Sequence, residues 1–236
     1  MEALHVWIMK SGEDSTSLRT SIETFVDWLA NGSPPWAAYR AFMSGRLIAL
    51  DKNPGVDPVG VRETWWSIFS KIVLKVMGLE ATMAFQDDQL CVGPKAGIDG
   101  TVHGVQSLRD KNLSTEEWFL KLVDAKNAFN KINRVRMLWT VRHLWPSGAH
   151  FVFNRYRHWS SIVLRNGNGA ASILHSREVV TKGDPLAMIA YRIGILPLIK
   201  NLKQEIPDVT HPSYADAAGT IGKFTRLETY FDFLTR

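Results

Sequence analysis

The chain has 236 residues, of which 45% are hydrophobic and 22% charged, a globular composition that excludes an intrinsically disordered protein. The 28 Lys and Arg residues outnumber the 23 Asp and Glu residues, and the net charge of +5 permits a polyanionic partner without demanding one. Cys91 is the only cysteine, so an intrachain disulfide and a cysteine-based zinc site are excluded, and a reducing compartment is expected.

The N-terminal stretch "MEALHVWIMKSGEDSTS" lacks a basic start and a long apolar segment, so we do not expect a signal peptide. No stretch of the sequence reaches the roughly 18 uninterrupted apolar residues that are typical of a transmembrane helix. We therefore expect an intracellular protein, in the nucleus or cytoplasm, that is not secreted and has no membrane partner.

The first half of the chain alternates helical patterns with one hairpin pattern. Apolar residues recur at helical spacing, and a Pro-Gly turn separates two β-rich runs. These patterns predict helices over residues 17–31 and 36–43, a hairpin over 46–61, a long apolar helix capped by Thr64, and a helix from Asp99 to about Arg109.

The second half continues this alternation. It predicts a buried strand over 118–124, helices over 133–145 and 147–160, a hairpin over 161–176 around Asn-Gly-Asn-Gly, a hairpin at Tyr214 and an amphipathic helix over 224–236. Asp184 and Pro185 should supply the N-cap and first residue of a long apolar helix, and Pro197 should kink this helix or end its first half. Interleaved helices and antiparallel hairpins indicate an α+β fold.

Two aspartates occupy positions where a metal site can form. Asp124 ends the apolar strand "WFLKLVD", and Asp216 lies at the tip of the hairpin predicted in "HPSYADAAGT". Carboxylates from neighbouring strands of one sheet can hold two Mg²⁺ ions for phosphoryl transfer. Each residue also has an ordinary interpretation, because Asp124 can cap the turn after its strand and Asp216 can be a turn aspartate.

Three segments in this order, "LVDAKNAFN", "TKGDPLAM" and "YADA", resemble the palm motifs of reverse transcriptases, specifically those of retrotransposons. The segment "RLIALDKNPGVDPVGV" is similar to the fingers hairpin of the same family. The resemblance covers roughly residues 35–236 and implies the fingers and palm of a right-hand polymerase, with an antiparallel palm sheet packed on helices. It divides the chain into an N-terminal helical segment (1–34), a fingers-like region (35–117) and a palm-like region (118–236), with the thumb expected to be missing.

The resemblance assigns roles to individual residues. It makes Asp124 and Asp216 the catalytic ligands of two Mg²⁺ ions, with Mn²⁺ as an alternative, and gives Phe129 the steric-gate position against the sugar 2′-hydroxyl. Lys52 would meet the incoming triphosphate, and Gly183, preceded by Lys182, would let the backbone approach the templating base pair. The implied partners are a primed RNA or DNA template and deoxynucleoside triphosphates, and the oligomeric state is not predicted.

The chain departs from the family pattern at three positions. Ala217 replaces the carboxylate expected directly after Asp216, Asp57 replaces an arginine of the fingers hairpin, and Lys182 replaces a glutamine. The sequence therefore predicts an RNA-directed DNA polymerase with two-metal nucleotidyl transfer, impaired in this copy. The alternatives are a catalytically dead nucleic-acid-binding remnant and a co-opted interaction scaffold.

A further segment, "RYRHW" at residues 155–159, interleaves cationic and aromatic residues in a composition that suits phosphates and stacked bases. The ordinary interpretation, which we favour from the sequence, is a helix with its aromatic residues buried and its arginines in solvent.

Overall fold

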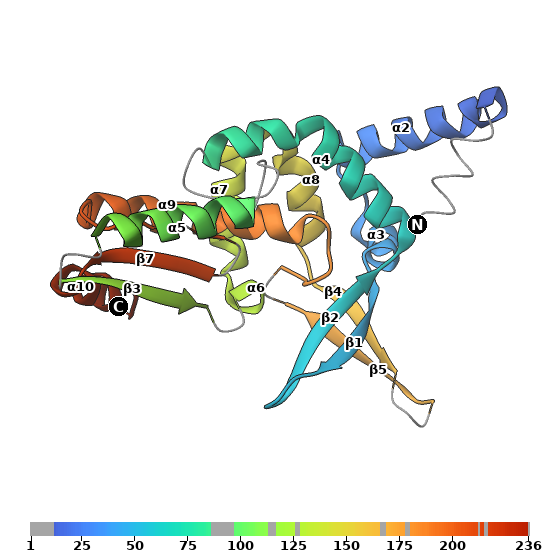
Figure 1. The fold of residues 1–236 in the computed structure, drawn as a ribbon. Coiled ribbons are helices and arrows are strands. Elements are labelled where there is room, and N and C mark those ends of the chain that lie inside the picture. The colour runs from blue at the N-terminus through green and yellow to red at the C-terminus, as the bar shows by residue number, and fades with distance from the viewer. Residues whose placement is uncertain are drawn as a thin grey trace.

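A computed structural model describes residues 12–85, 97–112, 117–125, 128–165, 169–177, 180–211, 213–214 and 217–235. Helices and two sheets interleave along the chain, so the α+β prediction is confirmed (Figure 1). The helices are η1 (Gly12–Ser15), α2 (Thr16–Asn31), α3 (Trp36–Phe42), α4 (Thr64–Phe85), α5 (Gly97–Asn112), α6 (Ala128–Lys131), α7 (Arg134–Leu144), α8 (Pro146–Tyr156), α9 (Ala187–Glu205) and α10 (Phe224–Thr235). The strands are β1 (Gly45–Asp51), β2 (Val56–Arg62), β3 (Trp118–Asp124), β4 (Ser160–Arg165), β5 (Ala171–Ser176), β6 (Ser213–Tyr214) and β7 (Ala217–Lys223).

Local sequence signals explain several of these boundaries. The Asn133 side chain accepts a hydrogen bond from the Arg136 backbone N–H and so caps α7. Pro146 begins α8, where its missing N–H costs no helical hydrogen bond. Pro197 lies inside α9, which continues to Glu205, so the prediction that it could end the helix is wrong.

The four-stranded sheet has the order β2-β1-β4-β5 and joins the two predicted hairpins. The pairs β1–β2 and β4–β5 are antiparallel, whereas β1 and β4 run parallel with Gly45 opposite Ile162. Because β1 and β4 come from opposite sides of the predicted boundary at residue 118, this sheet takes strands from both the fingers-like and the palm-like regions.

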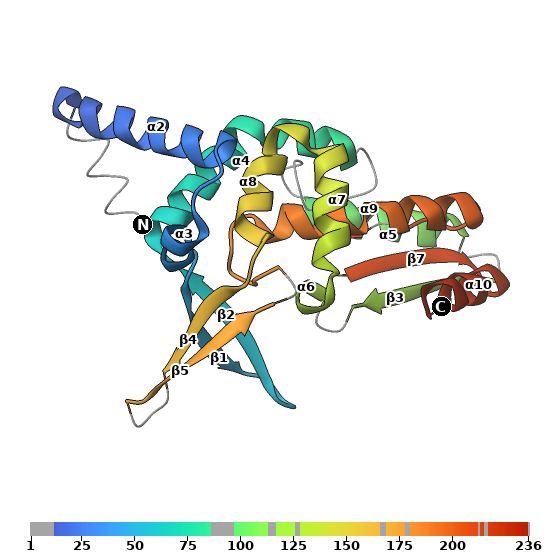
Figure 2. The ribbon, with the colours of Figure 1, turned by 180° about the vertical axis from the view of Figure 1, so that it is seen from behind.

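The three-stranded sheet has the order β3-β7-β6, and all its pairs are antiparallel. Helices α5 and α10 pack against it, and both views place it at the opposite end of the molecule from α2 (Figures 1 and 2). The strand predicted over 118–124 is confirmed, but its predicted burial is wrong. No residue of β3 is buried, and Leu122 is 77% exposed.

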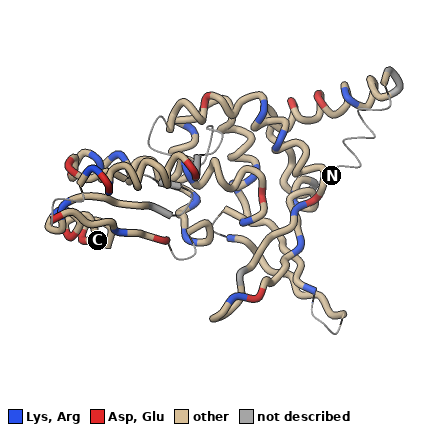
Figure 3. Tube along the Cα trace, viewed as in Figure 1, with Lys and Arg blue, Asp and Glu red and all other residues tan. Residues whose placement is uncertain are grey.

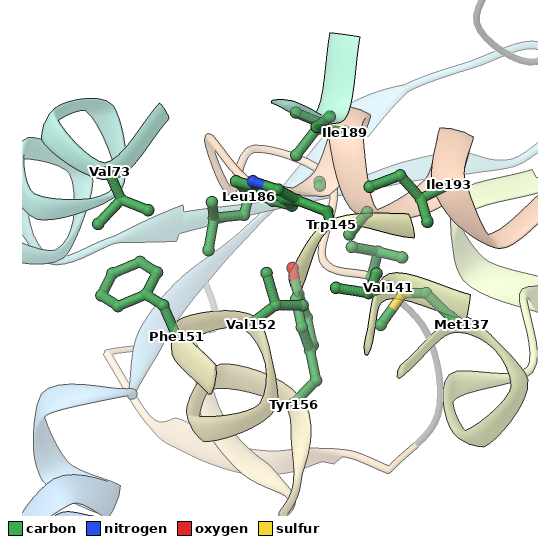
Figure 4. Close-up of a cluster of buried hydrophobic side chains, with 14 of the residues drawn as sticks. Val73, Met137, Val141, Trp145, Phe151, Val152, Tyr156, Leu186, Ile189 and Ile193 are labelled. Carbon is green, nitrogen blue, oxygen red and sulfur yellow. The ribbon is translucent and has the colours of Figure 1, made fainter. Parts of the chain in front are cut away.

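The main hydrophobic core lies between α4, α7, α8 and α9 (Figure 4). Trp66 from α4 stacks on Phe151 from α8, with ring centroids 5.0 Å apart and planes 8° from parallel. Trp145, between α7 and α8, is fully buried and donates its indole N–H to the Met77 carbonyl at 2.8 Å. Aromatic burial of this kind holds these helices together.

Within the described residues, no helix combines the length and apolar character needed to cross a lipid bilayer.

Candidate functional site

Asp124 is the last residue of β3 and lies directly opposite Ala217, the first residue of β7. Asp124 is exposed, and within the described part of the chain no hydrogen bond or ion pair engages its carboxylate. The structure therefore places this carboxylate at the exposed end of the predicted strand, and its role as a metal ligand stays a prediction. Asp216, which precedes Ala217 in the sequence, lies outside the described residues.

A divalent cation at this sheet edge needs more than one protein ligand. Among the residues that the structure describes, no group of three or more His, Cys, Asp or Glu side chains could hold a metal ion. The exposed Asp124 carboxylate is a hard oxygen donor of the kind that Mg²⁺ prefers, and Mg²⁺ keeps water where protein ligands are few. Asp216, the second carboxylate that the resemblance implies, lies outside the described residues, so the Mg²⁺ site stays a prediction.

Phe129 lies on the short helix α6, a few residues after Asp124. Its ring is 4.7 Å from the ring of Tyr191 on α9, and its carbonyl accepts a hydrogen bond from the Val180 N–H. Phe129 is half-buried and packs against the main core. These contacts hold the Phe129 ring in place shortly after the end of β3. Its steric-gate role stays a prediction.

Lys52 follows β1 in the turn of the first hairpin, where its backbone N–H donates to the Gly55 carbonyl at 3.0 Å. Its side chain is exposed, and the hairpin tip projects away from the helical body (Figure 1). The structure does not bring Lys52 into contact with Asp124. Asp57 pairs with Leu50 in the same hairpin, and its side chain lies outside the described residues.

Gly183 lies in the turn that connects β5 to α9 and has a φ of +96°, a conformation that favours glycine. A Cβ atom at this position would overlap the Gly60 carbonyl oxygen on β2. The Gly60 N–H donates to the Lys182 carbonyl at 2.8 Å, and Arg62 donates to the Thr181 hydroxyl. The backbone at Gly183 therefore lies so close to β2 that a side chain would not fit. Its predicted approach to a templating base pair stays a prediction.

Substitution of Gly183 by alanine should lower the free energy of unfolding by about 3 kcal/mol, because it combines positive-φ strain with the overlap at Gly60. Gly55→Ala is the matched control, since Gly55 has a φ of +100° but open space around its Cβ position. We expect the control to lose about 1 kcal/mol in urea denaturation. Equal losses in the two variants would show that the contact with β2 is unimportant.

Sequence reasoning missed a buried ion pair next to this turn. Arg155 Nε donates to Asp184 Oδ2 at 2.6 Å, and the two side chains are 1% and 0% exposed. Asp184 also accepts from the Trp66 indole at 3.2 Å and from the Leu186 N–H at 3.0 Å. The prediction that the arginines of 155–159 lie in solvent is wrong for Arg155, since packing between α4, α8 and the turn encloses it.

The same contacts correct the predicted start of α9. The helix begins at Ala187 and its N-cap position is Leu186, so Asp184 caps the preceding turn and not the helix. Burial alone would lower the pKa of Arg155, but the Asp184 carboxylate and Tyr156 raise it above its ordinary value. Burial, followed by the charge of Arg155, lowers the pKa of Arg62 to about 9. Both guanidinium groups are therefore positively charged at neutral pH.

No family model matches the chain, and no curated protein matches it. Among solved structures, the chain is similar to apo telomerase from Candida tropicalis, with a TM-score of 0.64 and 11% identity over 94% of this chain and 46% of that one. A form truncated from the C-terminal domain gives a TM-score of 0.63 and 13% identity over 83% of this chain and 47% of that one.

Telomerase from Candida albicans in complex with a TWJ fragment of telomeric RNA gives a TM-score of 0.61 and 10% identity, over 91% of this chain and 44% of that chain. The chain thus spans less than half the length of each of these telomerases. At such low identities the likeness shows the fold alone. It confirms the predicted polymerase fingers and palm and supports a reverse-transcriptase-like fold.

Proposed function

We propose that the chain is a reverse-transcriptase-like polymerase domain that binds a primed nucleic-acid template and whose catalysis is impaired by alanine at position 217. The observation that carries this proposal is the pairing of Asp124 with Ala217 at the end of β3, within a fold shared with telomerases. The proposal also includes the retrotransposon type, an RNA template and the use of deoxynucleoside triphosphates. These three parts rest on the motif resemblance alone.

Nucleic-acid binding is supported by two observations. Two of the structural neighbours are telomerases in complex with a fragment of telomeric RNA. The chain carries a net charge of +5, and its Lys and Arg residues occur on both sheets and on the helices, interspersed with acidic residues (Figure 3). Phosphate contacts from such a surface give affinity without sequence preference.

For catalysis, Asp124 and Asp216 would hold Mg²⁺, or Mn²⁺ in its place. The bound ions would activate the primer hydroxyl and stabilise the leaving oxygens. Asp124 contributes an exposed carboxylate at a fixed strand end, and Phe129 contributes a ring held against Tyr191. Lys52 would reach a triphosphate from the fingers hairpin, and Lys182 and Gly183 would lie beside the nucleotide.

A second candidate is a nucleic-acid-binding remnant without catalysis. It is favoured by alanine at position 217, opposite Asp124, where the motif resemblance implies a further carboxylate, because positioning of the reacting groups supplies much of the rate of phosphoryl transfer. A co-opted scaffold that keeps only the fold is the third interpretation. Binding to nucleic acid separates the scaffold from the other two, and primer extension separates the polymerase from the remnant.

The affinity for a primed template should fall steeply with salt, because phosphate contacts release counterions. Raising the salt from 50 to 200 mM should weaken binding by about tenfold or more, with little dependence on template sequence. Fluorescence anisotropy with two labelled primer–templates of unrelated sequence measures both effects. A dissociation constant that does not change over this range, or an absence of binding, would contradict nucleic-acid binding and favour the scaffold.

A further inference from the structure

A hollow of about 460 Å³ is lined by residues from α3, from the segment between α8 and β4, and from β5, namely Trp36, Arg40, Arg157, His158, Trp159 and His175. Two of the six are arginines, two are histidines and two are tryptophans, and none is acidic. This volume lies within the range of small-molecule sites in proteins.

Aromatic side chains form part of the wall of this hollow. The Trp36 ring and the His158 ring have centroids 4.6 Å apart, so they form one aromatic wall. Trp159 is 53% exposed although it is one of the largest apolar side chains in the protein. Arg177, which lies outside the six lining residues, places its guanidinium carbon 4.4 Å from the centre of the Trp159 ring.

The cationic residues are held near the aromatic ones by neutral partners. Arg157 donates to the Pro34 carbonyl at 2.6 Å, and Arg40 makes a long contact of 3.5 Å with the Ser161 hydroxyl. Within the described part of the chain, no carboxylate forms an ion pair with either arginine. Their positive charge is therefore available to an anionic ligand.

We propose that this hollow binds a segment of single-stranded nucleic acid, with a base stacked on Trp159 and backbone phosphates on Arg40 and Arg157. Aromatic side chains beside a positively charged groove are the means by which proteins hold single strands without sequence preference. Cationic and aromatic side chains continue past the rim of the hollow to Arg177. A surface of this length suits a strand of several nucleotides more than a single nucleotide. Paired bases in a duplex are stacked on one another, so a duplex cannot use Trp159 in this way.

This site is separate from the proposed catalytic edge and does not depend on a working polymerase. His175 belongs to the four-stranded sheet, whereas Asp124 belongs to the three-stranded one. A failure of the Ala217→Asp variant to extend a primer, with intact single-strand binding, would count against the proposed function and not against this inference.

The test measures binding of a fluorescein-labelled 12-nucleotide RNA by anisotropy in Mg²⁺-free buffer. The double variant Arg40→Glu/Trp159→Ala should weaken binding by at least about tenfold. The matched control is Arg136→Glu/Trp139→Ala on α7, where Trp139 is exposed and packs on His143 much as Trp36 packs on His158. The control should change the dissociation constant by less than about twofold, and melting curves should show that both variants are folded.

Two further measurements complete the test. The double variant in the hollow should alter binding to the corresponding RNA duplex far less than binding to the single strand. RNA carrying 5-iodouridine should crosslink, in the unsubstituted protein, to the peptide that contains Trp159. The inference is overturned if the hollow variant and the control lose affinity equally, if neither loses any, or if the RNA does not bind or crosslinks elsewhere.

Discussion

Replacement of Asp184 by asparagine should lower the free energy of unfolding by about 3–5 kcal/mol, because it leaves the Arg155 guanidinium buried without its counter-charge. The two side chains are almost completely enclosed, and their N–O distance is 2.6 Å. Asparagine keeps the shape of the side chain and can still accept from Trp66 and Leu186. The loss would therefore come from the missing charge and from the hydrogen bond of Arg155, because the amide NH₂ that replaces Oδ2 cannot accept. Denaturant unfolding measures this loss.

Two control variants isolate this effect. Glu117→Gln breaks the exposed pair between Lys223 and Glu117, at 3.3 Å, and should cost less than about 1 kcal/mol. Arg155→Met in the Asp184→Asn background removes the buried charge as well and should recover part of the lost stability. If Asp184→Asn costs no more than Glu117→Gln, the buried pair does not stabilise the turn before α9.

Substitution of Ala217 by aspartate should raise Mg²⁺-dependent extension of a primed template by at least about a hundredfold, equivalent to roughly 2.7 kcal/mol of barrier. Residues directly opposite each other in an antiparallel pair lie on the same face of the sheet. The new carboxylate would therefore lie beside Asp124 and complete the oxygen ligands at the end of β3. Single-turnover incorporation of one nucleotide measures the gain.

The matched control for this gain is Gly219→Asp, which adds a carboxylate to the same strand opposite Leu122 and not opposite Asp124. It should leave the rate unchanged. Isothermal titration should show tighter Mg²⁺ binding for Ala217→Asp than for Gly219→Asp, with circular dichroism confirming that both are folded. Equal rates in the two variants would mean that position 217 is not part of a metal site.

The elements of the fold follow from local signals that the sequence contains. Asn133 predicts the start of α7, and turn residues predict both hairpins of the four-stranded sheet. The parallel pairing of Gly45 with Ile162 could not be predicted, because strand pairing over such a separation depends on the packing of helices between the strands. The exposure of Leu122 was missed because an apolar run does not reveal whether other elements cover the face of its strand.

Some features of the candidate site were likewise predictable from the sequence, and others were not. Asp124 was predictable, because a carboxylate directly after an apolar run lies at the end of a strand. Its pairing with Ala217 follows only from the register of β3 and β7. The resemblance pointed to a close backbone approach at Gly183, but its contact with Gly60 was not predictable. Arg155 resembles a solvent-exposed helical arginine in sequence, and only the fold brings Asp184 to it.

The most direct test of the polymerase proposal is nucleotide choice by the Ala217→Asp variant on a primed RNA template in Mg²⁺. Each of the four deoxynucleoside triphosphates is supplied alone, and the templating base is varied. The proposal predicts that the variant incorporates the complementary nucleotide in preference to the other three, and that Asp124→Asn in the same background abolishes incorporation. Incorporation that ignores the template base, or that survives Asp124→Asn, would contradict it.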